Sequence, residues 1–143
     1  MKVLKDFEYY SDGSRKMERV RTLHEKELKK EVDDEHYYYN QQGQLVRYTY
    51  ENSENELAKY EEKYEKFNAD DMPTVVHYKG FNSSGKKVEY KKVIEYDEMG
   101  SEKTITYYSK WGKLMKKIEV SEEENASFEA DDDDLFASDE KEE

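Results

Sequence analysis

Apolar and polar residues alternate along most of residues 1–120, with the period of two that half-buried β-strands show. After Gly85, for example, Val88, Tyr90 and Ile94 fall on one side of the chain and charged residues fall on the other. The pattern predicts a mainly antiparallel β-sheet made of hairpins. The predicted strands cover residues 2–10, 15–23, 35–40, 44–51, 74–81, 86–96, 101–109 and 113–120, and the last four should form a meander.

Five of the six glycines follow an aromatic residue by four positions. Glycine adopts a positive φ at no steric cost, and Asn or Asp just before it favours a tight turn. The aromatic residue would end the incoming strand and pack across the ladder. The spacing therefore predicts five hairpin turns, with the pairs Tyr9/Gly13, Tyr39/Gly43, Phe81/Gly85, Tyr96/Gly100 and Tyr108/Gly112.

Two segments depart from this alternation. Residues 54–67 predict one helix, because residues 53–56 match a capping box and apolar residues follow at helical spacing. The apolar residues are Leu57, Tyr60, Tyr64 and Phe67. Residues 24–33 fit either a charged strand or a short helix, and we favour the strand. The predicted fold class is thus mainly β, of the α+β type, a curved antiparallel sheet with one helix.

Composition separates a folded body from a tail. Charged residues make up 42% of the chain and hydrophobic residues 34%, while aromatic residues reach 14%, which is high for a disordered chain. We expect the 14 tyrosines to supply most of a thin core. Residues 121–143 carry twelve acidic residues and one lysine, a net charge of −11. The composition therefore predicts one β-hairpin domain at 1–120 and a disordered acidic tail at 121–143.

The turns carry a resemblance to a known repeat class. The sequences Tyr-Tyr-Ser-Asp-Gly, Tyr-Asn-Gln-Gln-Gly and Tyr-Asp-Glu-Met-Gly resemble the tyrosine- and glycine-punctuated repeats of the YD and MORN-variant classes. Such repeats occur in bacterial proteins that include Rhs-type toxins and some antitoxins. The resemblance covers the five turns and their flanking strands, and it implies β-hairpin units. The spacing between turns is irregular here, so the resemblance concerns the fold rather than an activity.

Several classes of chemistry lack their residues. The chain has no cysteine, which excludes disulfides, thiol nucleophiles and zinc–thiolate sites. The three histidines, His24, His36 and His77, are far apart in sequence and lack the spacing of metal ligands. Residues 80–87 match the spacing of a phosphate-binding loop, but Lys87 stands where Ser or Thr must hold Mg²⁺. We therefore expect no enzyme activity, no cofactor and no catalytic or metal site.

The sequence also bears on the compartment. No run of apolar residues is long enough to span a membrane, and the first residues lack the apolar stretch of a signal peptide. We expect a cytoplasmic protein that does not bind membranes. A mature secreted domain whose signal has been removed would look the same.

The acidic tail is the first candidate for partner binding. Aromatic anchors spaced along an acidic segment can hold a basic partner, while the charge speeds the encounter. The run of four Asp followed by Leu-Phe resembles the acidic, aromatic-ended tails of bacterial and phage single-stranded-DNA-binding proteins, although seven residues follow the last aromatic here. That resemblance implies a tail that recruits partners and competes with nucleic acid. The candidate residues are Phe128, Asp131, Asp132, Asp133, Asp134, Leu135 and Phe136.

The second candidate is a lysine-rich part of the sheet. Residues 79–117 hold ten lysines and five acidic residues, and aromatic side chains on a basic sheet can stack nucleic-acid bases. Lysines also protect exposed strands from edge-to-edge pairing, and arginine is absent after Arg47, so we favour the protective role. The possible nucleic-acid face comprises Lys86, Lys87, Lys91, Tyr108, Trp111, Lys113, Lys116 and Lys117.

The functional prediction is a non-enzymatic binding module for a protein partner with a basic surface. The alternative is a single-stranded nucleic-acid-binding protein whose acidic tail is autoinhibitory. The sequence leaves the oligomeric state open.

Overall fold

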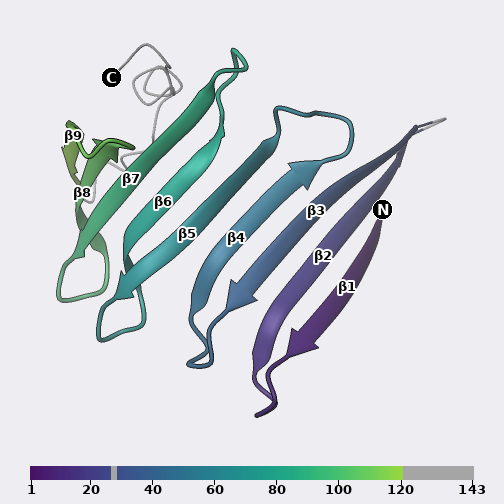
Figure 1. The fold of residues 1–143 in the computed structure, drawn as a ribbon, viewed down its shortest axis with the longest axis horizontal. Coiled ribbons are helices and arrows are strands. Elements are labelled where there is room, and N and C mark those ends of the chain that lie inside the picture. Colours follow the sequence, from purple (N-terminus) through teal and green to yellow (C-terminus); the bar gives the residue numbers. More distant parts are fainter. Residues whose placement is uncertain (27–28, 121–143) are drawn as a thin grey trace. The chain divides into compact units, whose positions relative to one another are not determined.

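The computed structural model describes residues 1–26 and 29–120, which form nine antiparallel strands and contain no helix (Figure 1). The strands follow one another in the sheet in the order of the sequence. This confirms the predicted antiparallel β class. The strands are β1 (Lys2–Tyr9), β2 (Arg15–Lys26), β3 (Lys29–Tyr39), β4 (Leu45–Asn52), β5 (Lys59–Phe67), β6 (Pro73–Phe81), β7 (Lys87–Tyr96), β8 (Glu102–Ser109) and β9 (Leu114–Glu119).

The described residues of the ambiguous segment, 24–26 and 29–33, are strand, as favoured from the sequence. They are divided between the end of β2 and the start of β3, which pair from Met17↔Tyr38 to Lys26↔Lys29. The four strands β6 to β9 pair in succession, so the predicted C-terminal meander is also confirmed.

The predicted helix at 54–67 is wrong, because tertiary contacts override the capping signal. Ser53 does not cap a helix: its hydroxyl accepts the backbone N–H of Val32 on β3 at 2.8 Å. The backbone then passes through a turn in which the Asn52 side chain accepts the N–H of Glu54 at 2.8 Å. Residues from Lys59 onward are strand β5, whose Tyr60 lies opposite Tyr50. Tyr60 and Tyr64 are four residues apart, a spacing that fits one side of a strand as well as one side of a helix.

The chain divides into two compact units, Met1–Lys63 and Tyr64–Glu143, with the boundary inside β5. We call them unit 1 and unit 2. The predicted tail at 121–143 lies outside the described residues.

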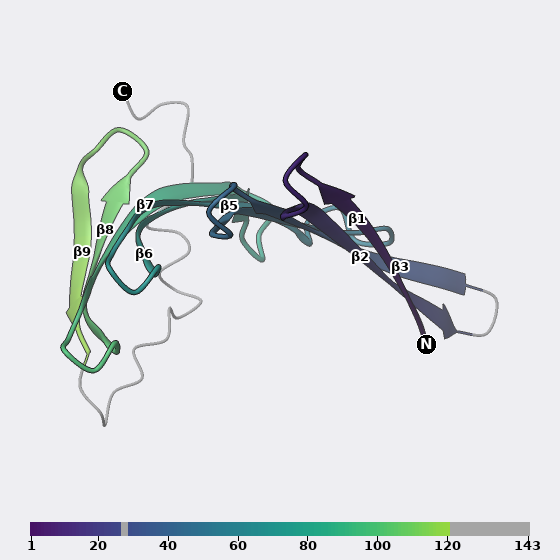
Figure 2. The same cartoon turned by 90° about the horizontal axis from the view of Figure 1, so that it is seen from below.

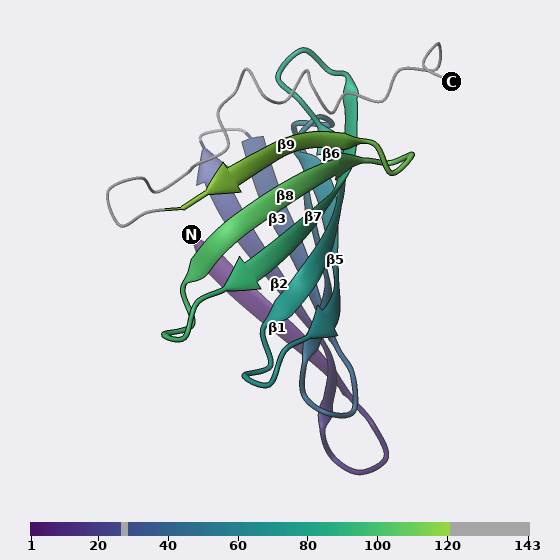
Figure 3. The same cartoon turned by 90° about the vertical axis from the view of Figure 1, so that its left-hand side faces the viewer.

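Unit 2 contains the buried core. Figure 2 and Figure 3 show its strands β6–β9 following a curve. Val88, Ile105 and Tyr107 form the core cluster and are 2–4% exposed. Most buried hydrophobic residues are Val and Ile, and Tyr107 is the single buried tyrosine among the 14. The expectation that tyrosines supply most of the core is therefore wrong: the other tyrosine rings stay partly exposed on the sheet.

Unit 1 differs in its burial. None of its described residues is buried, and its strands carry half-exposed side chains on both sides. Unit 1 is therefore a single layer whose side chains are held mainly by neighbours on adjacent strands.

The five predicted turns are all present. Gly13, Gly43, Gly85, Gly100 and Gly112 have φ values from 83° to 89°, and in each turn the glycine N–H donates to the carbonyl three residues earlier. A sixth turn of the same kind joins β5 to β6, where Asp71 takes the glycine position with a φ of 61°. Phe67 precedes Asp71 by four residues, so this turn also follows the aromatic spacing.

A polar side chain supports each of these turns. In five of them the residue after the aromatic accepts backbone N–H groups from both two and four residues further on. These acceptors are Asn40, Asn68, Asn82, Asp97 and Ser109. In the first turn Tyr10 takes that place, and Asp12 instead accepts the N–H of Ser14 at 2.9 Å.

Beside several turns the strand register shifts by one residue. In the last hairpin Tyr107 pairs with Lys116, whereas Tyr108 pairs with Leu114. Strict alternation predicts that Leu114 and Ile118 share a side of the sheet. Because this bulge adds a residue to β9, they lie on opposite sides. Leu114 is 59% exposed.

Glycine at the sixth turn should stabilise the protein. Asp71→Gly should raise the free energy of unfolding by about 0.5–1 kcal/mol, because glycine adopts the positive φ without strain. Gly43→Ala should lower it by about 1 kcal/mol through backbone strain alone, because no atom lies within 4 Å of the added Cβ. Urea denaturation measures both changes. Asp70→Gly, one residue earlier at an ordinary φ, is the control, and a gain equal to that of Asp71→Gly would contradict the role of φ.

Candidate functional site

Four tyrosines gather on one side of unit 1. Tyr37 of β3 lies opposite Tyr48 of β4, and Tyr50 of β4 lies opposite Tyr60 of β5. The ring centroids of Tyr37 and Tyr48 are 5.0 Å apart, and those of Tyr50 and Tyr60 are 5.4 Å apart. Tyr48 and Tyr60, at 5.8 Å, join the two pairs into one aromatic cluster.

Carboxylates on the same side accept the tyrosine hydroxyls. Tyr48 donates to Oε2 of Glu35 at 2.5 Å, and Tyr37 donates to the same oxygen at 3.2 Å. Tyr50 donates to Oδ1 of Asp33 at 2.6 Å. We call these six residues, Asp33, Glu35, Tyr37, Tyr48, Tyr50 and Tyr60, the tyrosine–carboxylate face.

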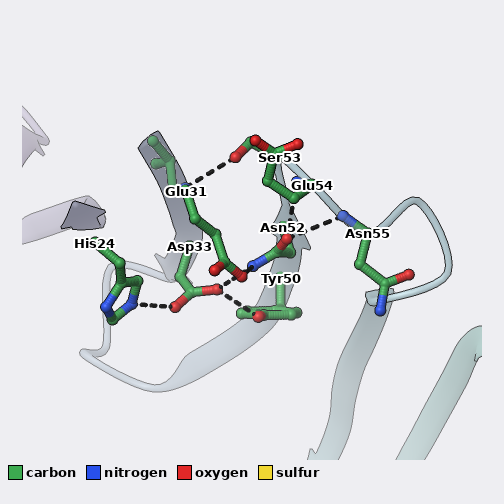
Figure 4. A network of polar contacts seen from close by, with 9 residues as sticks. His24, Glu31, Asp33, Tyr50, Asn52, Ser53, Glu54 and Asn55 are labelled. Atoms are coloured by element: carbon green, nitrogen blue, oxygen red, sulfur yellow. Dashed lines mark hydrogen bonds and ion pairs between the residues drawn. The ribbon is translucent and has the colours of Figure 1, made fainter. Parts of the chain in front are cut away.

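Asp33 is the most connected carboxylate of this face. Figure 4 shows it between His24, Tyr50 and Asn52. The Asn52 amide donates to Oδ1 at 2.7 Å, and His24 Nε2 lies 2.8 Å from Oδ2. The hydrogen bonds from Tyr50 and Asn52 lower the pKa of Asp33, so it stays ionised at neutral pH.

Three tyrosines of the face, Tyr37, Tyr48 and Tyr50, stay protonated. Burial, followed by the charge of Glu35, raises the pKa of Tyr37 from 10.0 to about 12. The hydrogen bond to Asp33, followed by burial, raises the pKa of Tyr50 to about 12. Burial and the hydrogen bond to Glu35 raise the pKa of Tyr48 as well. The hydroxyls therefore act as donors to the carboxylates across the physiological pH range.

The opposite side of unit 1 balances its charges with ion pairs. Arg19 binds Asp34 through two hydrogen bonds of 3.0 and 2.7 Å. Arg47 Nε donates to Glu61 at 2.5 Å, and its guanidinium lies over the Tyr38 ring, 5.1 Å from the centroid. The pairing lowers the pKa of Asp34.

The tyrosine–carboxylate face lacks such compensation. No lysine or arginine side chain that the structure describes forms an ion pair with Asp33 or Glu35. Their donors are phenols, an amide and an imidazole instead. Two carboxylates are thus held beside four aromatic rings, an arrangement that favours an external cation.

The polar residues near Asp33 do not form a catalytic triad. His24 uses Nε2 for Asp33, and the Ser53 hydroxyl accepts the amide of Val32. Within residues 1–26 and 29–120, no three His, Asp or Glu side chains are arranged to hold a metal ion.

The predicted nucleic-acid residues are divided between two sides and two turns of unit 2. Lys91 lies opposite Tyr108, with its ammonium 5.1 Å from the ring centroid, and Lys117 shares that side. Lys87 begins β7 on the same side, whereas Lys116 lies opposite Tyr107 on the other side. The remaining members are in turns: Lys86 after β6, and Trp111 and Lys113 between β8 and β9.

The other candidate site falls outside the described residues. It comprises the tail residues Phe128, Asp131, Asp132, Asp133, Asp134, Leu135 and Phe136. Their role in partner binding stays a prediction.

Sequence reasoning missed the tyrosine–carboxylate face, although part of its signal was present. Tyr48 and Tyr50 alternate along one strand, and the turn at 40–43 implies that this strand pairs with the preceding one. The bulge at Tyr38/Tyr39 shifts that pairing by a residue, so the turn alone does not bring Tyr48 beside Tyr37. Tyr60 was assigned to the predicted helix.

No family model, curated protein or solved structure matches this chain in comparisons of sequence and fold. Among the described residues, no helix has the length and apolar character needed to cross a membrane.

The raised pKa values predict a late ionisation of tyrosines. Tyr37 and Tyr50 bind their protons more tightly in the folded than in the unfolded state. Their contribution to stability should therefore be complete below about pH 10 and be lost between about pH 10 and 12. Phenolate absorbance followed during an alkaline titration measures this. Glu35→Gln should lower the pKa of Tyr37, because it removes a nearby negative charge. Ionisation of all tyrosines together near their ordinary pKa would contradict the prediction.

Proposed function

We propose that this chain is a non-enzymatic binding module that engages a protein partner with a basic surface. The observation that carries the proposal is the tyrosine–carboxylate face, where Glu35 and Asp33 are held by hydroxyl, amide and imidazole groups rather than by described lysines or arginines. A basic partner would supply the missing positive charge.

The chemistry of the face suits a cationic side chain. The faces of aromatic rings carry negative potential and attract cations, and partly desolvated carboxylates bind them more strongly than exposed ones do. A tyrosine also gives a large contact area at a low cost in conformational entropy, which is why it is enriched in protein interfaces. The ring cluster and the carboxylates together form a binding surface of this kind.

The scaffold also favours binding without rearrangement. The face lies on paired β-strands rather than on a loop, and hydrogen bonds fix the hydroxyl and carboxylate groups in place. A preorganised surface loses less conformational entropy on association.

The acidic tail is proposed as a second contribution. Its net charge of −11 would attract a basic partner over long range, and its aromatic residues Phe128 and Phe136 would add contacts. Residence in the cytoplasm likewise stays a proposal drawn from the sequence.

A direct test uses the full-length chain and a labelled peptide of mixed lysine and arginine residues, with binding followed by fluorescence anisotropy. Glu35→Gln removes the charge and keeps an oxygen that accepts the tyrosine hydroxyls. It should weaken binding about tenfold, equivalent to about 1.4 kcal/mol, because a desolvated charge pair is lost.

The matched control is Glu51→Gln. Glu51 is exposed and lies opposite Asp34, on the other side of the same strands. Its substitution removes the same charge and should change the affinity less than about twofold. If both substitutions weaken binding equally, attraction to the overall negative charge explains the result, and the face is not the binding site. Replacing Phe128 and Phe136 by Ala measures the separate contribution of the tail.

A further inference from the structure

We infer that the group recognised at Glu35 is the guanidinium of an arginine side chain of the partner. This inference rests on the proposed function, since it specifies the chemistry of the same face. Three features of the chain support it: the arginine sites of unit 1, the contacts of two lysines with aromatic rings, and the groups around Glu35.

Unit 1 twice places an arginine against both an aromatic ring and a carboxylate. The guanidinium of Arg47 lies 5.1 Å from the centroid of Tyr38, while its Nε donates to Glu61. The guanidinium of Arg15 lies 4.6 Å from the centroid of Phe7, while Nη1 donates to Glu18 at 3.3 Å. In each case the ring lies on the strand before that of the arginine, while the carboxylate is on the strand after it for Arg47 and on the same strand for Arg15. A single guanidinium therefore satisfies both groups in the geometry of this sheet.

Two lysines of the same chain contact rings without forming an ion pair. The ammonium of Lys16 is 5.8 Å from the centroid of Tyr10, and that of Lys91 is 5.1 Å from the centroid of Tyr108. In the described part of the chain neither of these lysines forms an ion pair. The difference follows from shape, because a planar guanidinium can stack on a ring while its N–H groups donate in the plane, whereas an ammonium is a compact point charge.

The surroundings of Glu35 repeat the pattern of the arginine sites but lack the arginine. Tyr37 and Tyr48 both donate to Oε2, whereas Oε1 accepts no hydrogen bond from the described residues. The two rings, 5.0 Å apart, lie beside the carboxylate on the same side of the sheet. An incoming guanidinium could stack against this pair and donate to Oε1. The bonds to Oε2 would be retained, so binding does not require the hydroxyl groups to move.

Two peptides distinguish arginine from lysine recognition. They share one sequence and one net charge, and all basic positions are arginine in the first and lysine in the second. Binding to the full-length chain is measured at physiological ionic strength. We expect the arginine peptide to bind about tenfold more tightly, because it gains stacking and paired hydrogen bonds at Glu35.

Three variants locate that preference. Glu35→Gln and Tyr37→Leu should each reduce the ratio of the two affinities to within about twofold, since each removes one half of the site. Glu51→Gln, on the other side of the sheet, should leave the ratio unchanged. Circular dichroism establishes that each variant is folded. If Tyr37→Leu does not fold, Glu35→Gln still tests the site, because it retains an oxygen that accepts the tyrosine hydroxyls.

The possible failures are separable. If neither peptide binds, both the proposed function and this inference are wrong. If both bind equally well and Glu35→Gln weakens both, the proposed binding of a basic partner is supported and the preference for arginine is overturned. If the arginine preference persists in Glu35→Gln, the guanidinium is recognised elsewhere on the chain and the assignment to Glu35 is wrong.

Discussion

Five of the hairpins depend on one recurring interaction, a turn side chain that accepts two backbone N–H groups. In the turn after β3 the side-chain oxygen Oδ1 of Asn40 accepts the N–H groups of Gln42 and Gln44, each at 3.0 Å. These bonds stabilise the left-handed residue that follows and place the next strand beside the last. Since the described strands pair in the order of the sequence, an error at one turn would displace the pairing of the strand that follows it.

Charge compensation differs between Asp34 and Glu35, which lie on opposite sides of unit 1. On one side arginines neutralise the carboxylates, and Arg19 and Asp34 bind each other through two hydrogen bonds. On the other side tyrosine hydroxyls hold Glu35 without neutralising it. A hydroxyl satisfies the hydrogen-bonding capacity of a carboxylate but leaves its charge in place. Glu35 therefore keeps a charge that Asp34 shares with an arginine, and the proposed function rests on this difference.

Local signals predicted much of the fold and little of the site. The glycine turns and the alternation of residues 86–96 were sufficient for the C-terminal meander, because both act within one hairpin. The helix prediction failed because the Ser53 hydroxyl binds Val32, twenty-one residues earlier. The sixth turn was missed because Asp71 adopts a φ that usually indicates glycine. The tyrosine–carboxylate face required the register of three strands, including a bulge, which no single segment encodes.

Pairing between successive strands also has a consequence for folding kinetics. The contacts of each strand lie with the strands just before and after it, so loop closure involves short stretches of chain. Low contact order accelerates folding, and a β-sheet of this topology should form faster than one whose strands pair at long range. A hairpin can begin the process at any turn and add its neighbours in succession, as in repeat proteins. For the same reason, a sheet of this kind can be lengthened by duplicating a hairpin while the existing ladders keep their partners.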